Sequence, residues 1–195
     1  MSEPYGFADF IAEVRAVMPR ALPPSDTLRT LRPGFERLLA NRTFLDEEIR
    51  KLGTAADEVC LHHDREHDFV VLARGVSRGA ARQGESHAAM PHDHGPLWAL
   101  YGLYEGPARL QRYAPDPGAQ DGPFPGLRLL SDTPSEAGAI DAILPHSMHL
   151  PVFPENGGNV IIVVYSQPLG KVVRRGYVAA RKAVVDFQGA FPPTA

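Results

Sequence analysis

The sequence predicts an all-β core preceded by two or three helices, and three observations support this. Apolar residues recur every three or four positions up to about residue 52, which is typical of amphipathic helices. From about residue 58 the apolar runs become short, and Gly, Pro and Asp separate them. The 19 prolines and 18 glycines gather between these runs, as tight strand connections require. We expect an antiparallel sandwich or a small barrel.

The helical part divides into three predicted segments. The first carries one apolar stripe, formed by Phe7, Phe10, Ile11, Val14, Val17 and Met18. Pro19, Pro23 and Pro24 separate it from a second helix, which Ser25 or Asp26 could cap and which Pro33-Gly34 is expected to interrupt. The third is predicted over Phe44 to Leu52, because Thr43 is a plausible cap and the first turn is acidic.

Seven short apolar runs are the predicted strands. In chain order they are Val59–His62, Asp68–Ala73, Trp98–Tyr104, Leu110–Tyr113, Leu127–Leu130, Ala139–Leu144 and Asn159–Tyr165. Tyr177 to Phe187 predicts a closing strand pair, and Ala114 to Gly126 a hairpin loop. We expect one compact domain, in which residues 1–56 form a helical extension packed on a barrel of residues 57–195.

Composition excludes several classes of function. The net charge of −3 leaves no basic surplus for nucleic acid, and the run Lys171 to Arg175 is interpreted as a solvated face or turn. No segment approaches the roughly 20 apolar residues that span a bilayer, and the N-terminus lacks the pattern of a signal peptide. We therefore expect a cytoplasmic protein. The single cysteine, Cys60, excludes an internal disulfide and is interpreted as a buried, inert thiol.

Histidines at two places in the chain indicate a metal site. His92 and His94 lie at i and i+2, so on an extended strand their side chains project to the same side. The run Pro145-His146-Ser147-Met148-His149 can supply a third imidazole from a distant strand. Three imidazoles would hold one face of a divalent ion and leave the other open, which suits a catalytic rather than a structural site. His146 and His149 face opposite sides of a strand, so only one of them serves easily.

These motifs resemble the cupin superfamily, and within it the thiol dioxygenases of the cysteine dioxygenase type. The similar residues are His92-Asp93-His94-Gly95, Trp98, Gly102, Glu105-Gly106, Pro145-His146-Ser147-Met148-His149 and Tyr165-Ser166-Gln167-Pro168-Leu169. The resemblance covers roughly Val59 to Leu169. It implies a cupin-type double-stranded β-helix, an antiparallel jelly-roll barrel, behind N-terminal helices. It also implies metal ligation by His92, His94 and His149, and a catalytic tyrosine at Tyr165.

The chain departs from the family pattern at three places. The glutamate ligand of many cupins falls on Ala99, and thiol dioxygenases also lack that ligand and bind iron through three histidines. The serine and histidine that accompany the family's tyrosine fall on Ile161 and Val163. No arginine is evident at the position before the barrel where the family binds a carboxylate. These differences argue against cysteine itself as the substrate.

The resemblance implies a dioxygenase that acts on a small molecule with O₂. Its cofactor would be one divalent metal, Fe(II) before Zn or Ni, and Trp98, Leu97, Ile161 and Val163 are expected to form the substrate-binding wall. A homodimer is possible, and neither nucleic acid nor a membrane is expected as a partner. The alternative is a metal-binding cupin without turnover that serves as a small-molecule sensor. A zinc-dependent isomerase or hydrolase is less favoured, because no carboxylate general base neighbours the motif.

Overall fold

Three helices precede ten strands in the computed structural model, which describes residues 5–52, 58–75, 90–118, 124–154 and 159–188. The helices are α1 (Phe7–Val17), α2 (Pro24–Ala40) and α3 (Phe44–Leu52). The strands are β1 (Glu58–His63), β2 (Val70–Arg74), β3 (Ala99–Glu105), β4 (Ala108–Pro115), β5 (Leu127–Ser135), β6 (Ile140–Ile143), β7 (Met148–Val152), β8 (Val160–Tyr165), β9 (Val173–Val178) and β10 (Ala183–Gln188). Short 3₁₀ turns cover Met18–Arg20, Leu169–Lys171 and Ala179–Arg181.

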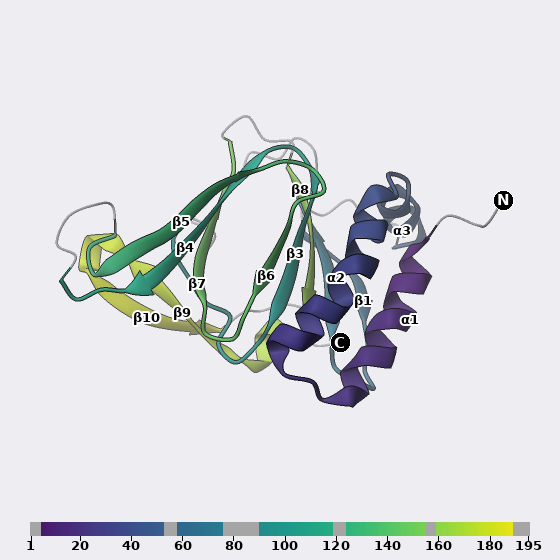
Figure 1. Cartoon of the computed structure of the whole chain (residues 1–195), viewed down its shortest axis with the longest axis horizontal. Helices are drawn as coiled ribbons and strands as arrows, with labels where there is room; N and C mark the ends of the chain where they lie inside the picture. The colour runs from purple at the N-terminus through teal and green to yellow at the C-terminus, as the bar shows by residue number, and fades with distance from the viewer. Residues whose placement is uncertain (1–4, 53–57, 76–89, 119–123, 155–158, 189–195) are drawn as a thin grey trace.

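The described strands form antiparallel sheets that face each other. One sheet has the order β1-β2-β8-β3-β6, the second β5-β4-β7, and the third pairs β9 with β10 (Figure 1). The strand segment at His92 joins the last two, because it bridges to His149 of β7 on one side and to Gly176 of β9 on the other. β5 and β6 are both edge strands, so the barrel is not closed between them.

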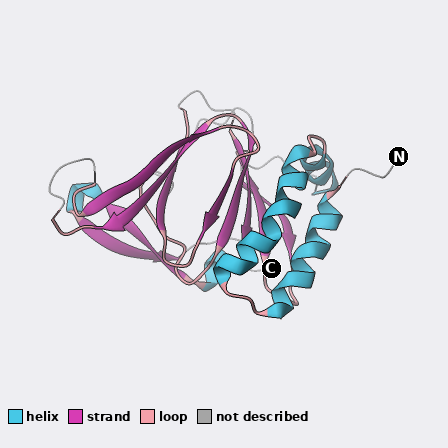
Figure 2. Cartoon of the chain, viewed as in Figure 1, coloured by secondary structure: helices cyan, strands magenta, loops and turns pink. Residues whose placement is uncertain are grey.

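The helices cover the outer face of the five-stranded sheet, as Figures 1 and 2 show. Successive side chains of a strand lie on opposite faces of this sheet. In β8, Ile162 and Val164 pack with the helices. Ile161, Val163 and Tyr165 face the interior between the sheets. The outer cluster is large, and its fully buried members include Phe10, Leu31, Phe35, Leu38, Leu100, Ile162 and Val164. Gly102 of β3 permits close packing of α2, because a Cβ atom there would lie 2.6 Å from Leu39 and 2.7 Å from Phe35.

The predicted all-β core with N-terminal helices is confirmed. Two helix predictions were wrong: α2 begins at Pro24, so Ser25 and Asp26 lie inside it and do not cap it, and it runs without interruption through Pro33. An internal proline costs about 3 kcal/mol, but here the buried stripe of Leu28, Leu31, Phe35 and Leu38 holds the helix against the sheet.

Each of the seven predicted apolar runs overlaps an observed strand, whereas β7, the strand that supplies His149, is not among those runs. The closing pair is β9–β10, and β9 begins at Val173, before the predicted start. Among the described helices, none has both the length and the apolar character needed to cross a membrane.

Candidate metal centre

Three buried histidines converge in the interior between the sheets. His92, His94 and His149 each offer a ring nitrogen, and these atoms all lie within 4.8 Å of one another. The first two come from the segment before β3 and the third from β7. Mutual backbone hydrogen bonds between His92 and His149, each 2.9 Å, fix the two segments side by side. His94 Nε2 lies 3.0 Å from His149 Nε2.

Burial keeps these imidazoles neutral. It lowers the pKa of His92 to about 4, and the nearby Arg174 and Arg74 act in the same direction. Burial also holds the pKa values of His94 and His149 well below the usual range, and their mutual proximity adds to this. A metal binds the neutral form of histidine, so the three side chains are ready to donate lone pairs without losing a proton.

The residues present fit a divalent metal. His92 Nδ1 lies 3.0 Å from the carbonyl oxygen of Met90, so this nitrogen donates a hydrogen bond and Nε2 keeps its lone pair. His94 Nδ1 is buried and has no hydrogen-bond partner among the described residues. Three neutral imidazoles packed together need a cation or shared protons to satisfy their lone pairs. Within the described residues no carboxylate joins this group.

Two tyrosines lie against the histidines. Tyr101 Oη lies 2.7 Å from Tyr165 Oη and 3.1 Å from His94 Nε2. Both side chains are buried, and both project into the interior from neighbouring strands, β3 and β8. Burial, and after it the neighbouring Tyr165, raises the pKa of Tyr101 well above the usual range, so its hydroxyl stays protonated.

Two arginines lie near the tyrosines. Arg74 ends β2 and forms an ion pair with Glu58. Burial opposes its charge, yet Tyr165, Tyr101 and Glu58 raise the pKa of Arg74 above its usual range. Arg174 of β9 is only 6% exposed, and burial lowers its pKa. Its guanidinium carbon lies 4.5 Å from the centroid of the Phe187 ring, and its Nε has no hydrogen-bond partner among the described residues.

Asp93, between the two histidines, points away from them. Its carboxylate is fully buried and accepts hydrogen bonds from the backbone amides of Gly95 and Arg175 and from the Arg175 guanidinium. The backbone amide of Asp93 donates in turn to the carbonyl oxygen of Arg175 at 2.8 Å. The histidine segment is therefore fixed to β9, the strand that also carries Arg174.

The structure brings most of the predicted site residues together. Leu97, Ile161 and Val163 belong to the interior cluster that contains Tyr165. Trp98 does not: it packs in the outer cluster with the helices, so the prediction that it lines the site was wrong. The reason is strand parity, since Trp98 immediately precedes the inward-facing Ala99. His146 is exposed at a turn with φ 58°, whereas His149 is 2% exposed and joins the histidine group.

Sequence reasoning missed Tyr101, Arg74 and Arg174. The alternation of inward and outward side chains could have indicated Tyr101, which lies two residues after Ala99. Arg174 belongs to the basic run interpreted as solvated, and its burial corrects that interpretation. Glu85 and His87, which precede the first motif in the chain, lie outside the described residues. Cys60 is half-buried, and burial raises the pKa of its thiol.

Comparison with known proteins gives similarity of fold alone. No family model matches the sequence, and no curated protein matches it. An oxalate oxidase in complex with the substrate analogue glycolate is 14% identical, with a TM-score of 0.34 over 51% of this chain. The chain spans only 41% of that oxidase.

Two other solved structures are similar over somewhat more of the chain. A cupin-2 domain protein from Shewanella frigidimarina is 12% identical, with a TM-score of 0.38 over 62% of this chain and 89% of its own. Hydroquinone 1,2-dioxygenase in complex with Cd²⁺ and 4-hydroxybenzonitrile is 12% identical, with a TM-score of 0.39 over 57% of this chain and 64% of its own.

Proposed function

We propose that this protein is a metal-dependent enzyme, a non-haem Fe(II) dioxygenase that acts on a small anionic molecule. The observation that carries the proposal is the convergence of His92, His94 and His149, buried and neutral, in the interior between the sheets. Imidazole nitrogens suit Fe(II), Zn or Ni, and a three-histidine set leaves open positions for other ligands. When bound, Fe(II) would supply a Lewis-acidic and redox-active centre for chemistry with O₂.

One buried arginine, Arg174, and one half-buried arginine, Arg74, support an anionic substrate. Arg74 already has Glu58 as an ion-pair partner, but Arg174 is buried with an unpartnered Nε among the described residues. A buried cation without a full set of acceptors is costly, and a carboxylate is the group whose geometry matches a guanidinium. Tyr165 and Tyr101 contribute to the pKa values of both arginines, which supports an anion held by Arg174 in the neighbourhood of the tyrosine pair.

The tyrosine pair would position a proton at the reacting group. Tyr101 donates or accepts across a 2.7 Å contact with Tyr165, and the raised pKa of Tyr101 keeps its hydroxyl protonated at neutral pH. One hydroxyl of the pair can therefore donate a hydrogen bond to a bound ligand, while its hydrogen bond with the other hydroxyl fixes its orientation. Leu97, Ile161 and Val163 are apolar and buried, so they exclude water from the same space.

Oxygen consumption tests the proposal. Protein loaded anaerobically with Fe(II) is mixed with O₂ and with small acids that carry a thiol, and β-dicarbonyl compounds serve as a second panel. We expect substrate-dependent O₂ uptake with at least one compound that carries a carboxylate. Arg174→Gln should raise KM by about tenfold or more for that compound, because a charged hydrogen bond contributes on the order of 1.5–3 kcal/mol. Arg109→Gln, at an exposed ion pair with Asp132, is the matched control and should behave as wild type.

The second candidate is a metal-binding sensor without turnover. Its specific support is the pair Ile161 and Val163, apolar residues at the positions where the resembling family has a serine and a histidine beside the tyrosine. A compound that binds the Fe(II)-loaded protein without any O₂ uptake would favour the sensor and contradict the dioxygenase.

A further inference from the structure

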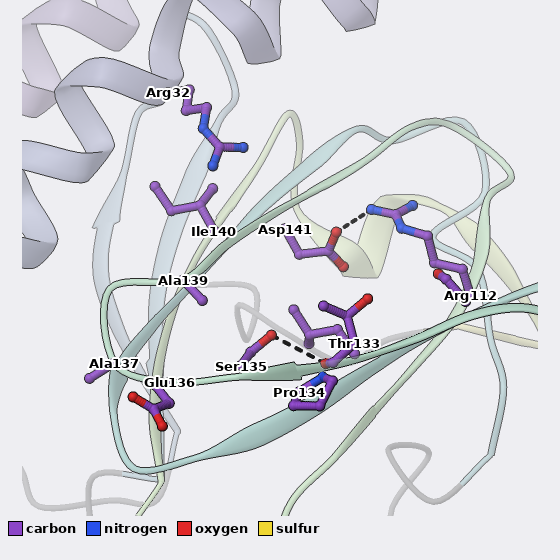
Figure 3. Close-up of a pocket in the computed structure, with 12 residues that line it drawn as sticks. Arg32, Arg112, Thr133, Pro134, Ser135, Glu136, Ala137, Ala139, Ile140 and Asp141 are labelled. Carbon is purple, nitrogen blue, oxygen red and sulfur yellow. Dashed lines mark hydrogen bonds and ion pairs between the residues drawn. The ribbon is translucent and has the colours of Figure 1, made fainter.

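A pocket of about 500 Å³ opens between β5 and β6, the two edge strands that leave the barrel unclosed. Its lining is mixed: Leu110, Ala139 and Ile140 are apolar, whereas Ser131, Thr133 and Ser135 on β5 carry hydroxyls and Arg112 and Asp141 carry charges (Figure 3). Thr133 is exposed at the outer part of this lining. The pocket therefore begins at the surface and offers hydroxyl and charged groups to which a small polar molecule can hydrogen-bond.

Strand pairing places part of this lining on the same face of the sheet as His149. Arg112 of β4 is the direct cross-strand partner of Ser131 on one side and of His149 on the other. Directly opposed residues of an antiparallel pair project to the same face, so Ser131, Arg112 and His149 share the inner face of their sheet. In the opposite sheet Asp141 of β6 is the partner of Tyr101, which contacts His94.

One ion pair belongs to the pocket lining and neighbours the site. Arg112 donates from Nη2 to the carboxylate of Asp141 and, at 2.8 Å, to the carbonyl oxygen of Ala142. Its members belong to different sheets, and each is the immediate neighbour of a site residue. The Arg112 side chain is 32% exposed and that of Asp141 11%, whereas His149 is buried.

We propose that this pocket is the route by which small polar ligands reach the three-histidine group, and that the Arg112–Asp141 pair forms its inner gate. The inference rests on the proposed metal site. Movement of one arginine side chain would join the pocket to the interior, because Arg112 bridges the two sheets at the point where no strand pairing closes them. A group that obstructs the pocket should slow the arrival and the departure of a ligand equally, and leave its equilibrium affinity unchanged.

Azide binding to the Co(II)-loaded protein, followed by stopped-flow absorbance, tests this route. Thr133→Trp places a bulky side chain in the outer pocket. We expect its association and dissociation rates both to fall by about tenfold, with Kd within about twofold of wild type. Leu130→Trp is the matched control: it lies on the same strand, 53% exposed and outside the pocket lining, and should bind azide at the wild-type rate.

Arg112→Gln should change the azide rates in the opposite direction. Unlike Thr133→Trp, it does not require the fold to accept a larger side chain. It removes the charge that holds the gate, so both azide rates should rise by about threefold or more. Wild-type azide rates in Thr133→Trp and Arg112→Gln, with Co(II) bound normally, would overturn the route and leave the metal site standing. Failure of wild-type protein to bind Co(II) would instead overturn the proposed function, and the route with it.

Discussion

The guanidinium of Arg175 holds the buried carboxylate of Asp93 through two contacts, 2.7 Å from Nε and 2.6 Å from Nη2. Asp93 lies between two candidate metal ligands, and Arg175 lies next to the buried Arg174. Together with the backbone-amide hydrogen bonds between Asp93 and Arg175, this ion pair holds the histidine segment against the strand that would bind an anionic substrate.

Arg175→Gln should weaken both the fold and the metal site. It leaves a fully buried carboxylate without its cation, and we expect a loss of about 2–4 kcal/mol in the free energy of unfolding. Urea denaturation of the metal-free protein measures this loss, and a Co(II) titration should show affinity reduced by about tenfold. Arg109→Gln breaks an exposed ion pair and should change neither quantity. Equal effects of the two variants would show that the Arg175–Asp93 ion pair does not hold the histidine segment in place.

Gly95→Ala should destabilise the protein far more than Gly138→Ala. Both glycines have positive φ, 59° and 92° respectively, so each substitution carries a backbone cost of about 1 kcal/mol. A Cβ atom at Gly95 would also lie 2.4 Å from the carbonyl oxygen of Val173, whereas nothing lies within 4 Å at Gly138. The difference between the two thermal unfolding midpoints measures the effect of the close contact with Val173, because the backbone cost is common to both variants. Similar midpoints would mean that β9 does not lie against the histidine segment.

The metal-free protein should lose stability as the pH falls from 6.5 toward 4. Burial lowers the pKa of His92 from 6.5 to about 4, so the unfolded chain binds a proton in this range before the folded protein does. His92 alone contributes on the order of 3 kcal/mol above pH 6.5, and this contribution disappears as the pH approaches 4. His94 and His149 act in the same direction.

Urea midpoints at pH 7, 6 and 5 measure this dependence. His92→Gln should reduce it, leaving the part due to His94 and His149, and His146→Gln, at an exposed turn, should leave it unchanged. A wild-type midpoint that does not change between pH 7 and pH 5 would show that these histidines are not buried and neutral.

Local patterns predicted much of the fold. The period of the apolar residues distinguished the helical segment from the strands, because helices and strands bury different spacings. β7 was missed because its short run, Met148–Val152, contains a proline and a histidine and has little strand character on its own. Its strand conformation comes from pairing with β4 and with the His92 segment. The continuity of α2 through Pro33 likewise depends on packing against the sheet, which no local pattern reveals.

Part of the site could be predicted from the sequence for the same reason. His92 and His94 form a local pattern, and the motif around His149 supplied a distant partner, so these three could be named from the chain. Arg174 could not be named in this way, because its burial depends on how β9 pairs with the segment at His92. Trp98 was assigned to the wrong face because its strand parity relative to Ala99 was not applied.

The most direct test is the metal content of two variants, His149→Ala and His146→Ala. Metal-free protein is loaded with Co(II), freed of excess by gel filtration and analysed for bound metal. We expect one equivalent in the wild type and in His146→Ala, whose substituted side chain is exposed, and less than about a tenth of an equivalent in His149→Ala. A full equivalent retained by His149→Ala would contradict the three-histidine site.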